Sequence, residues 1–261
     1  MKHHINPIPM RIPQQPDLCC AAVIATACEW MGIDYGNSLN NLAVRLGLHV
    51  NEKFKDMYTP ELAKRALPEG HVDIGMTIDS LEQPRLIEKI KRELEGLVLK
   101  VHRLKDITEI DERLYNPSFA IPNLENFLEN NLDKNRPIGI NYRLEPFTGR
   151  KDGHYGLIFA YDNKNKDVYI CEPSPFNRKH WKAPLTTFIR AMQAAWKEDD
   201  QQPRERGLIT FAGPTKRKEQ DIKTIIRFLL KVPKFIPANY RIIRYPSSPK
   251  ERGHPYNPRN P

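Results

Sequence analysis

Residues 19–32 read CCAAVIATACEWMG, and this stretch decides the fold that the sequence predicts. Small or apolar side chains stand on nearly every face of a helix drawn through it, which is typical of a helix buried on all sides. Asp17 stands where it would cap the first turn, and Gly32 stands where a left-handed residue would end the helix. We therefore expect one buried helix over about residues 19–31, with two adjacent cysteines at its N-terminus.

The residues around this helix predict an arm, further helices and one strand. Residues 5–17, INPIPMRIPQQPD, are rich in proline, which fixes φ and disfavours helix in the residue before it, so an extended arm is expected there. Apolar spacing and capping residues predict helices over 38–47, from Thr59-Pro60-Glu61 onward, over 83–94 and over 122–134, and alternation predicts a strand over 97–104.

The second half of the chain reads mainly as strands. They are expected over 136–144, 154–162, 167–173 and 207–213, with a helix over 184–197. The polar run Asn163-Lys164-Asn165-Lys166 predicts a turn that joins two of the strands into a hairpin. Helices first and an antiparallel sheet second is the order of an α+β fold.

Charge divides the chain unevenly. Of 41 Lys and Arg and 32 Asp and Glu, twelve basic and three acidic residues fall in 214–261, so this segment carries the whole net charge of +9. Eight of the 23 prolines lie there as well. We therefore place a domain boundary after residue 213, between a formally neutral domain over 1–213 and a basic, proline-rich extension over 214–261.

The basic extension contains one amphipathic segment. Apolar side chains recur from Ile222 to Leu230 at helical spacing, with Lys and Arg opposite them, which predicts a helix within 219–231. It would either dock on the preceding domain or bind an acidic partner or an anionic membrane surface. No recognised nucleic-acid motif occurs, and nucleic acid is not the expected partner.

Cysteine usage and hydropathy exclude several classes of protein. The four cysteines form no C-x-x-C pair and are too sparse for a disulfide scaffold, so neither a structural metal nor a cofactor is expected. No run of eighteen apolar residues occurs, and the N-terminal residues contain no apolar signal-peptide core. The expected location is cytoplasmic, with secretion that needs no cleaved signal left open.

The cysteines at the start of the buried helix are candidates for nucleophilic chemistry. Backbone N–H groups and the positive end of the helix dipole meet there and stabilise a thiolate. Cys19 is the expected nucleophile, Cys20 is the alternative, and Cys28 and Cys171 are expected in the core. Gln14 and Gln15, just upstream, would bring an amide donor to the same place.

A nucleophilic cysteine needs a base and a group that orients the base. His154 begins a long apolar strand, and Gly153 and Gly156 beside it permit close approach of other groups. Glu172 ends the next strand. If the two strands pair as a hairpin, His154 and Glu172 lie near the same sheet edge and complete a Cys–His–carboxylate constellation.

Several short motifs follow one another in order along residues 8–212. They are a Gln, Cys19 with Gly32 thirteen residues later, Arg136-Pro137-Ile138, Gly153-His154-Tyr155, Tyr161-Asp162 and Glu172-Pro173, followed by Trp181 and a helix. In this order they resemble the papain-like cysteine peptidases, and most closely their C39-like branch. The resemblance implies a papain-like α+β fold, with a helical N-terminal part that carries the nucleophile helix and a C-terminal antiparallel sheet.

The resemblance also implies roles for individual residues. Cys19 would be the nucleophile, His154 the general base and Glu172 the orienting residue, with Gln14 or Gln15 and the Cys19 N–H forming the oxyanion hole. The chain departs from the family where Cys20 replaces the usual Gly or Trp and where Glu172 replaces Asp or Asn. The glutamines also stand five and four residues before Cys19, whereas the family spacing is six.

These expectations point to a thiol hydrolase that cleaves a peptide or isopeptide bond in a peptide or protein substrate. Two alternatives stay open. An acyltransferase or transpeptidase would use the same triad and pass the acyl group to an amine instead of water. A catalytically inactive protein of the same fold would act through its basic tail.

Overall fold

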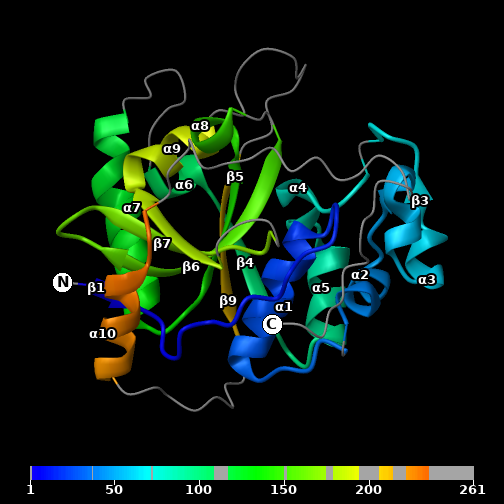
Figure 1. Cartoon of the computed structure of the whole chain (residues 1–261), viewed down its shortest axis with the longest axis horizontal. Helices are drawn as coiled ribbons and strands as arrows, with labels where there is room; N and C mark the ends of the chain where they lie inside the picture. The colour runs from blue at the N-terminus through cyan, green and yellow to red at the C-terminus, as the bar shows by residue number, and fades with distance from the viewer. Residues whose placement is uncertain are drawn as a thin grey trace.

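The computed structural model describes residues 2–36, 38–71, 73–108, 117–149, 152–174, 179–193, 206–213 and 222–234, which form a mixed helical and antiparallel-sheet (α+β) fold (Figure 1). The elements in chain order are β1 (Lys2–His4), α1 (Cys19–Met31), α2 (Leu39–Leu46), β2 (Val50–Asn51), the 3₁₀ helix η1 (Glu52–Met57), α3 (Pro60–Ala63), β3 (Ala66–Leu67), α4 (Ile78–Leu81), α5 (Pro84–Glu93), β4 (Val98–Arg103), α6 (Leu104–Thr108), α7 (Pro117–Asp133), β5 (Ile138–Arg143), α8 (Glu145–Thr148), β6 (Gly153–Asp162), β7 (Asp167–Cys171), β8 (His180–Pro184), α9 (Leu185–Gln193), β9 (Gly207–Ala212) and α10 (Ile222–Lys231).

A seven-stranded antiparallel sheet forms the centre of the molecule. Its strand order is β4-β9-β5-β6-β7-β8, and β1 pairs with the C-terminal end of β6. The predicted hairpin is confirmed, because β6 and β7 pair with Asp162 opposite Asp167 across the polar turn. The other predicted strands are confirmed as β4, β5 and β9, whereas β1 and β8 were not predicted.

The buried helix predicted over residues 19–31 is α1. Its side chains from Cys20 onward are almost all buried, and the N–H of Gly32, which has φ 71°, donates to carbonyls of the last turn. The predicted cap is wrong. Asp17 itself adopts a left-handed conformation, and its carboxylate accepts from the Asn51 N–H at 2.9 Å instead of capping α1. The N-cap position falls to Leu18, whose apolar side chain has no acceptor to offer.

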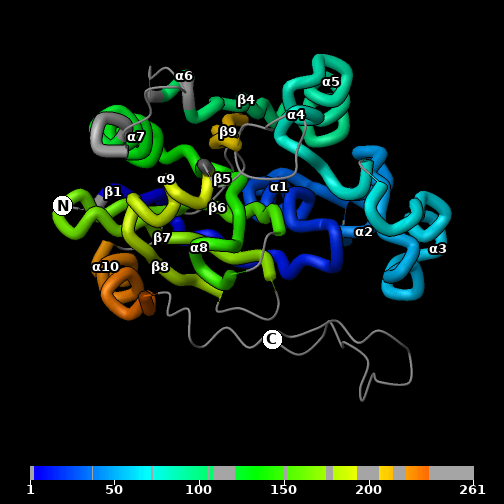
Figure 2. Tube along the Cα trace, turned by 90° about the horizontal axis from the view of Figure 1, so that it is seen from above, coloured from blue at the N-terminus to red at the C-terminus, as the bar shows by residue number. Residues whose placement is uncertain are grey.

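Helices cover both faces of the sheet. Alternation along β6 sends neighbouring side chains to opposite faces. Tyr155 faces α1, whereas His154 and its cross-strand partner Tyr142 face α9, where the Tyr142 ring meets Phe188 edge-on at 5.8 Å. The helices α2 and α3 continue from α1 away from the sheet, α5 returns to contact β4, and α7 lies beside β1 and β6 (Figures 1 and 2). The N-terminus of α1 therefore arrives beside the first residues of β6.

The proline-rich arm runs as extended chain from β1 to α1, as predicted. Hydrogen bonds fasten it along the way: the Ile5 N–H donates to Phe159 O at 2.9 Å, and the Trp30 indole N–H donates to Pro7 O at 2.6 Å. Near its end, the Gln14 N–H donates to Pro173 O at 2.8 Å. The last of these bonds ties the segment before Cys19 to the chain just after Glu172.

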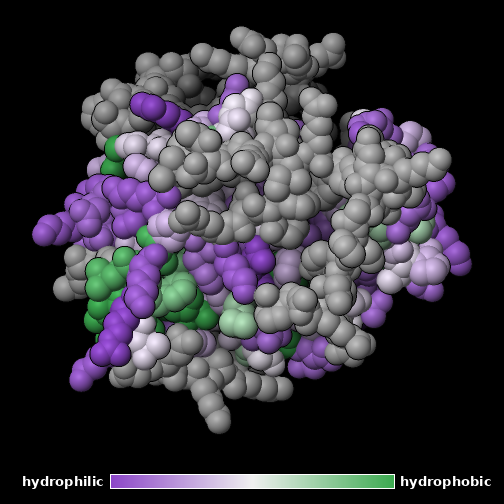
Figure 3. All heavy atoms as spheres, in the orientation of Figure 1, coloured by the Kyte–Doolittle hydropathy of each residue, from purple (hydrophilic) through white to green (hydrophobic). Residues whose placement is uncertain are grey.

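The amphipathic helix of the basic extension, α10, docks on the sheet. Ile225 and Leu229 are fully buried, and the following Pro233 carbonyl accepts from the Lys182 N–H of β8 at 3.0 Å. Ile222, Ile226 and Leu230 lie beside them on the same apolar side of the helix but are exposed, and they contribute to the apolar patch visible over α10, which hydrophilic side chains cross (Figure 3).

The predicted boundary after residue 213 falls just before residues 214–221, which lie outside the described part of the chain, as does the end of the helix predicted over 184–197. Within the described ranges, no helix combines the length and the apolar character that crossing a membrane requires.

Two neighbouring leucines of α10 provide a test of the docking. Leu229→Ala should lower the free energy of unfolding by about 2–5 kcal/mol, because it opens a cavity in a buried contact. Leu230→Ala, which removes the same atoms from a side chain that is 72% exposed, should change it by less than about 0.5 kcal/mol. Urea denaturation of the two variants measures the difference. Equal effects would mean that α10 does not dock in solution.

Candidate active site

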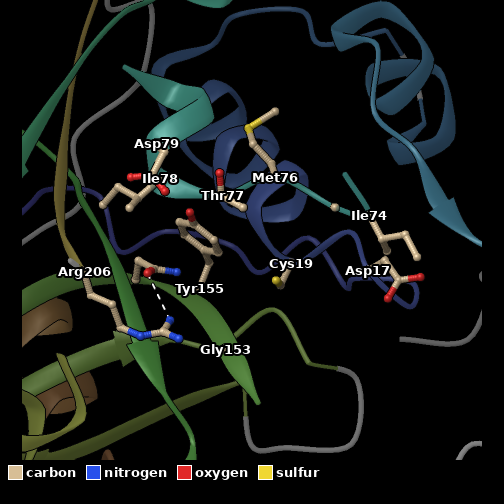
Figure 4. Close-up of a pocket in the computed structure, with 12 residues that line it drawn as sticks. Asp17, Cys19, Ile74, Met76, Thr77, Ile78, Asp79, Gly153, Tyr155 and Arg206 are labelled. Atoms are coloured by element: carbon tan, nitrogen blue, oxygen red, sulfur yellow. Dashed lines mark hydrogen bonds between the residues drawn. The ribbon is translucent and has the colours of Figure 1, made fainter. Parts of the chain in front are cut away.

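Cys19 is the first residue of α1 and lines a cavity between this helix and the sheet (Figure 4). Its side chain is half-buried. The N–H groups of a first helical turn have no acceptor within the helix, so they and the helix dipole favour negative charge at this place. A thiolate on Cys19, or an oxyanion formed beside it, therefore meets backbone donors.

His154 lies in β6 next to Cys19. Its ring is buried, and its Nε2–H donates to Glu172 Oε1 at 2.6 Å. The Cys19 side chain also interacts with the ring and raises its pKa. Since Nε2 is used by the carboxylate, Nδ1 is the ring nitrogen left for the sulfur. The structure thus brings the three residues predicted for the triad together, with His154 hydrogen-bonded to Glu172 and interacting with Cys19.

Glu172, directly after β7, is only 1% exposed. Four donors surround its carboxylate. Oε1 accepts from His154 and from the Ser174 N–H at 2.9 Å, and Oε2 accepts from the Trp181 indole at 3.1 Å and the Tyr142 hydroxyl at 3.3 Å. A buried carboxylate is tolerated only when such bonds satisfy it. Trp181 and Tyr142 therefore belong to the site.

Burial and charge act against each other on the His–Glu pair. Burial lowers the pKa of His154, but the Glu172 charge and the hydrogen bonds with Cys19 and Glu172 outweigh it and raise the pKa to about 10. Burial likewise raises the pKa of Glu172, but the His154 charge and the bonds from His154, Ser174 and Trp181 hold it below its ordinary value. Both effects favour a protonated imidazole beside an ionised carboxylate.

Aromatic rings enclose the pair on the α9 side of the sheet. The Tyr142 ring meets the His154 ring edge-on at 5.5 Å, and Phe147 and Phe188 lie beyond it. Trp181 stacks on Phe188 at 5.4 Å between centroids. These contacts fix the His154 ring and exclude water from one side of it, while the other side opens toward Cys19.

The other cysteines occupy different surroundings. Cys20, the alternative nucleophile, is 2% exposed, points its Sγ toward Met76 Sδ at 3.5 Å, and has a pKa well above the ordinary value because burial disfavours its thiolate. Cys28 and Cys171 are buried in the core as predicted, and burial raises the pKa of the Cys28 thiol to about 12. Of the four, Cys19 alone is not buried.

The two glutamines predicted for the oxyanion hole differ. The side-chain nitrogen of Gln15 donates to Met57 O at 3.3 Å and is therefore already in use. Gln14 is tied by its backbone to Pro173, and the Oε1 atoms of both glutamines are buried with no hydrogen-bond partner in the described part of the chain. Neither glutamine lines the cavity beside Cys19. Unlike the side-chain nitrogen of Gln15, that of Gln14 donates no hydrogen bond within the described part of the chain.

The cavity beside Cys19 has a volume of about 260 Å³. Asp17 and Cys19 line one side, Ile74 to Asp79 of the segment that leads into α4 line another, and β5, β6 and Arg206 complete it (Figure 4). The sequence did not identify Arg206 or Tyr155 as cavity residues: nothing in the local pattern distinguishes Arg206, and Tyr155 stood only as a neighbour of His154. No group of three or more His, Cys, Asp or Glu that could hold a metal ion occurs among the described residues.

Comparison with known proteins adds no relative to this picture. No protein-family model matches the chain, and no curated protein matches its sequence significantly.

The raised pKa of His154 predicts how stability depends on pH. A histidine that binds its proton more tightly when folded stabilises the fold fully below its unfolded pKa of 6.5, and this contribution is lost as pH rises from there to about 10. Glu172→Gln removes the charge that raises the pKa and should abolish this loss. Urea melts of both proteins between pH 6.5 and 10 should therefore converge as pH rises. A gap that stays constant across this window would contradict the assignment.

Proposed function

We propose that the protein is a thiol hydrolase of papain-like fold that cleaves peptide or isopeptide bonds through an acyl-enzyme on Cys19. The observation that carries the proposal is the grouping of Cys19, His154 and Glu172 at the N-terminus of a buried helix, with His154 hydrogen-bonded to Glu172, interacting with Cys19, and Cys19 lining a cavity. Nucleophile, base and orienting acid in this order are the arrangement that activates a thiol for attack on a carbonyl.

The proposed reaction begins from the ion pair in which the Cys19 proton has already passed to His154, because the raised pKa of His154 favours a protonated imidazole. The sulfur then attacks the substrate carbonyl carbon, the C–N bond breaks, and His154 gives its proton to the departing amine. A thioester remains on Cys19. His154 next takes a proton from water, whose oxygen attacks the thioester, and returning that proton to the sulfur releases the carboxylic acid. Glu172 stays ionised throughout and stabilises the imidazolium.

The oxyanion that forms at each attack needs donors. The backbone N–H of Cys19, at the start of α1, would supply one of them. Gln14 is the better candidate for the second, because the amide nitrogen of Gln15 already donates to Met57 O.

Two other functions use the same site. If an amine replaces water in the second half of the reaction, the protein is an acyltransferase, and only product analysis separates the two. An inactive binding protein would not need the half-buried thiol or the four donors on Glu172, and so this function has less support. An acidic partner or anionic membrane surface for the 214–261 extension stays a prediction.

Selective alkylation tests the assignment of the nucleophile. Iodoacetamide at neutral pH should modify Cys19 and leave Cys20 unmodified, because burial raises the pKa of Cys20 and encloses its sulfur. Peptide mapping by mass spectrometry identifies the modified residue. His154→Ala should slow the reaction by about 10²-fold or more, because the base is lost.

Cys19→Ala and Cys20→Ala form the matched pair for this test. Cleavage of a peptide library should be lost in the first variant and kept in the second. Loss in Cys20→Ala alone, with an unchanged thermal melt, would move the nucleophile by one residue and refute the proposed triad.

The two glutamine variants test the oxyanion hole. Gln14→Ala should reduce kcat for peptide cleavage by about 10²-fold or more with little change in thiol alkylation, since alkylation forms no oxyanion. Gln15→Ala should have a much smaller effect on kcat. The reverse order of the two effects would assign the amide to Gln15.

A further inference from the structure

Arg206 brings a positive charge into the cavity that contains Cys19. It is the residue before β9 and lies across the cavity from Asp17, with Cys19 and Tyr155 between them (Figure 4). A cation in the cavity of a candidate nucleophile acts on whatever substrate group enters beside the scissile bond. The charge of that group can therefore be inferred from the way Arg206 is held and from the other charges around it.

The backbone holds Arg206 in one place. Gly207 lies so close to β4 that an added Cβ would be 2.3 Å from His102 O, and the Arg206 carbonyl accepts from the Leu104 N–H at 3.4 Å. The guanidinium lies against Gly153, where an added Cβ would be 3.1 Å from Nη1. Glycine immediately before His154 thus makes the space that the guanidinium occupies.

Side-chain and backbone acceptors then orient the guanidinium. Nη1 donates to Asn141 Oδ1 at 3.1 Å and to Tyr142 O at 3.2 Å. Asn141 in turn donates to His154 O at 3.3 Å. Arg206 is therefore coupled through β5 to the strand that carries the general base, and a planar guanidinium with this fixed orientation is suited to bind a carboxylate.

The acidic residues of the cavity are engaged with other groups. Asp79 forms an ion pair with Arg103 at 2.7 Å. Asp17 accepts from the Asn51 N–H and the Tyr58 hydroxyl, and burial raises its pKa. The cavity also holds one polar group ready for a ligand: the Tyr155 hydroxyl is buried and has no hydrogen-bond partner among the described residues. The cavity therefore combines a cation with a donor, which suits an anionic group.

We propose that Arg206 binds a carboxylate of the substrate next to the bond that Cys19 attacks. The inference rests on the proposed function and names its substrate class: peptides with an acidic side chain, or a free terminal carboxylate, beside the scissile bond. The cavity of about 260 Å³ holds such a group with space left, since a water molecule takes about 30 Å³.

Four small electrophiles test the proposal without knowledge of the natural peptide. Chloroacetyl-glutamic acid α-amide and chloroacetyl-glutamine α-amide differ only in a side-chain carboxylate. Chloroacetyl-glycine and chloroacetyl-glycinamide differ only in a terminal carboxylate. In each, the Cys19 sulfur displaces chloride and forms a thioether, and mass spectrometry gives the rate of modification.

In the wild-type protein, at least one carboxylate probe should react about tenfold faster than its neutral partner. A hydrogen bond between charged groups contributes enough free energy for a difference of this size. The pair that shows the preference identifies the source of the carboxylate. Arg206→Gln should bring this ratio close to one. Arg206→Lys keeps the positive charge without the planar guanidinium and should retain part of the rate ratio. This variant keeps the test valid if Arg206→Gln proves too unstable to assay. Arg190→Gln, on the exposed side of α9, is the matched control and should retain the full ratio.

Equal rates within both probe pairs, or a preference that survives in Arg206→Gln, would overturn the carboxylate assignment and leave the thiol mechanism standing. Failure of all four probes to modify Cys19 would instead overturn the proposed function and this inference with it.

Discussion

The structure depends on one buried carboxylate. Glu172 is removed from water, and an ionised group in that position is tolerated only when donors reach it from every side. The four donors come from β5, β6, β8 and the chain just after Glu172 itself. Satisfying Glu172 therefore fixes how these strands meet, orients the His154 ring, and raises the pKa of that ring to about 10. The need to satisfy the buried Glu172 carboxylate therefore also keeps His154 protonated beside Cys19.

A second constraint places the sulfur. The helix α1 is buried on all sides, so its position relative to the sheet is set by packing and not by the residues at its N-terminus. The arm before it is fastened to Phe159, Thr26 and Pro173, and the last bond ties residue 14 to the residue just after Glu172. Asp17 then joins this loop to Asn51. Nucleophile, base and acid thus belong to three segments that are far apart in the sequence and are held together by the core and by backbone hydrogen bonds.

Much of this arrangement could be predicted from the sequence, because its signals are local. The uniform small and apolar pattern predicted α1, and the polar turn between two apolar runs predicted the β6–β7 hairpin, which brings His154 and Glu172 to one edge. What was missed depends on tertiary contacts. The strand β8 is only five residues long, and Tyr142 is one more buried residue of β5, so nothing in the local sequence marks Trp181 or Tyr142 as a donor to Glu172. Asp17 is of the residue type, and at the position, expected of a helix cap. In the folded loop its carboxylate accepts a hydrogen bond from the Asn51 N–H instead, and this contact is not visible in the local sequence. Arg206 is one of many basic residues in the sequence. Only the folded chain shows that Gly153 leaves space for its guanidinium and that Asn141 of β5 accepts a hydrogen bond from it.

The central claim is that Cys19 forms a covalent acyl intermediate that depends on His154. Intact-mass spectrometry of the protein, quenched during reaction with an activated acyl ester, measures this directly. The account predicts that the acyl group appears on Cys19 and disappears as water resolves it, and that His154→Ala acquires and loses it far more slowly. Acylation of another residue, or acylation of Cys19 that is equally fast and equally short-lived in His154→Ala, would contradict it.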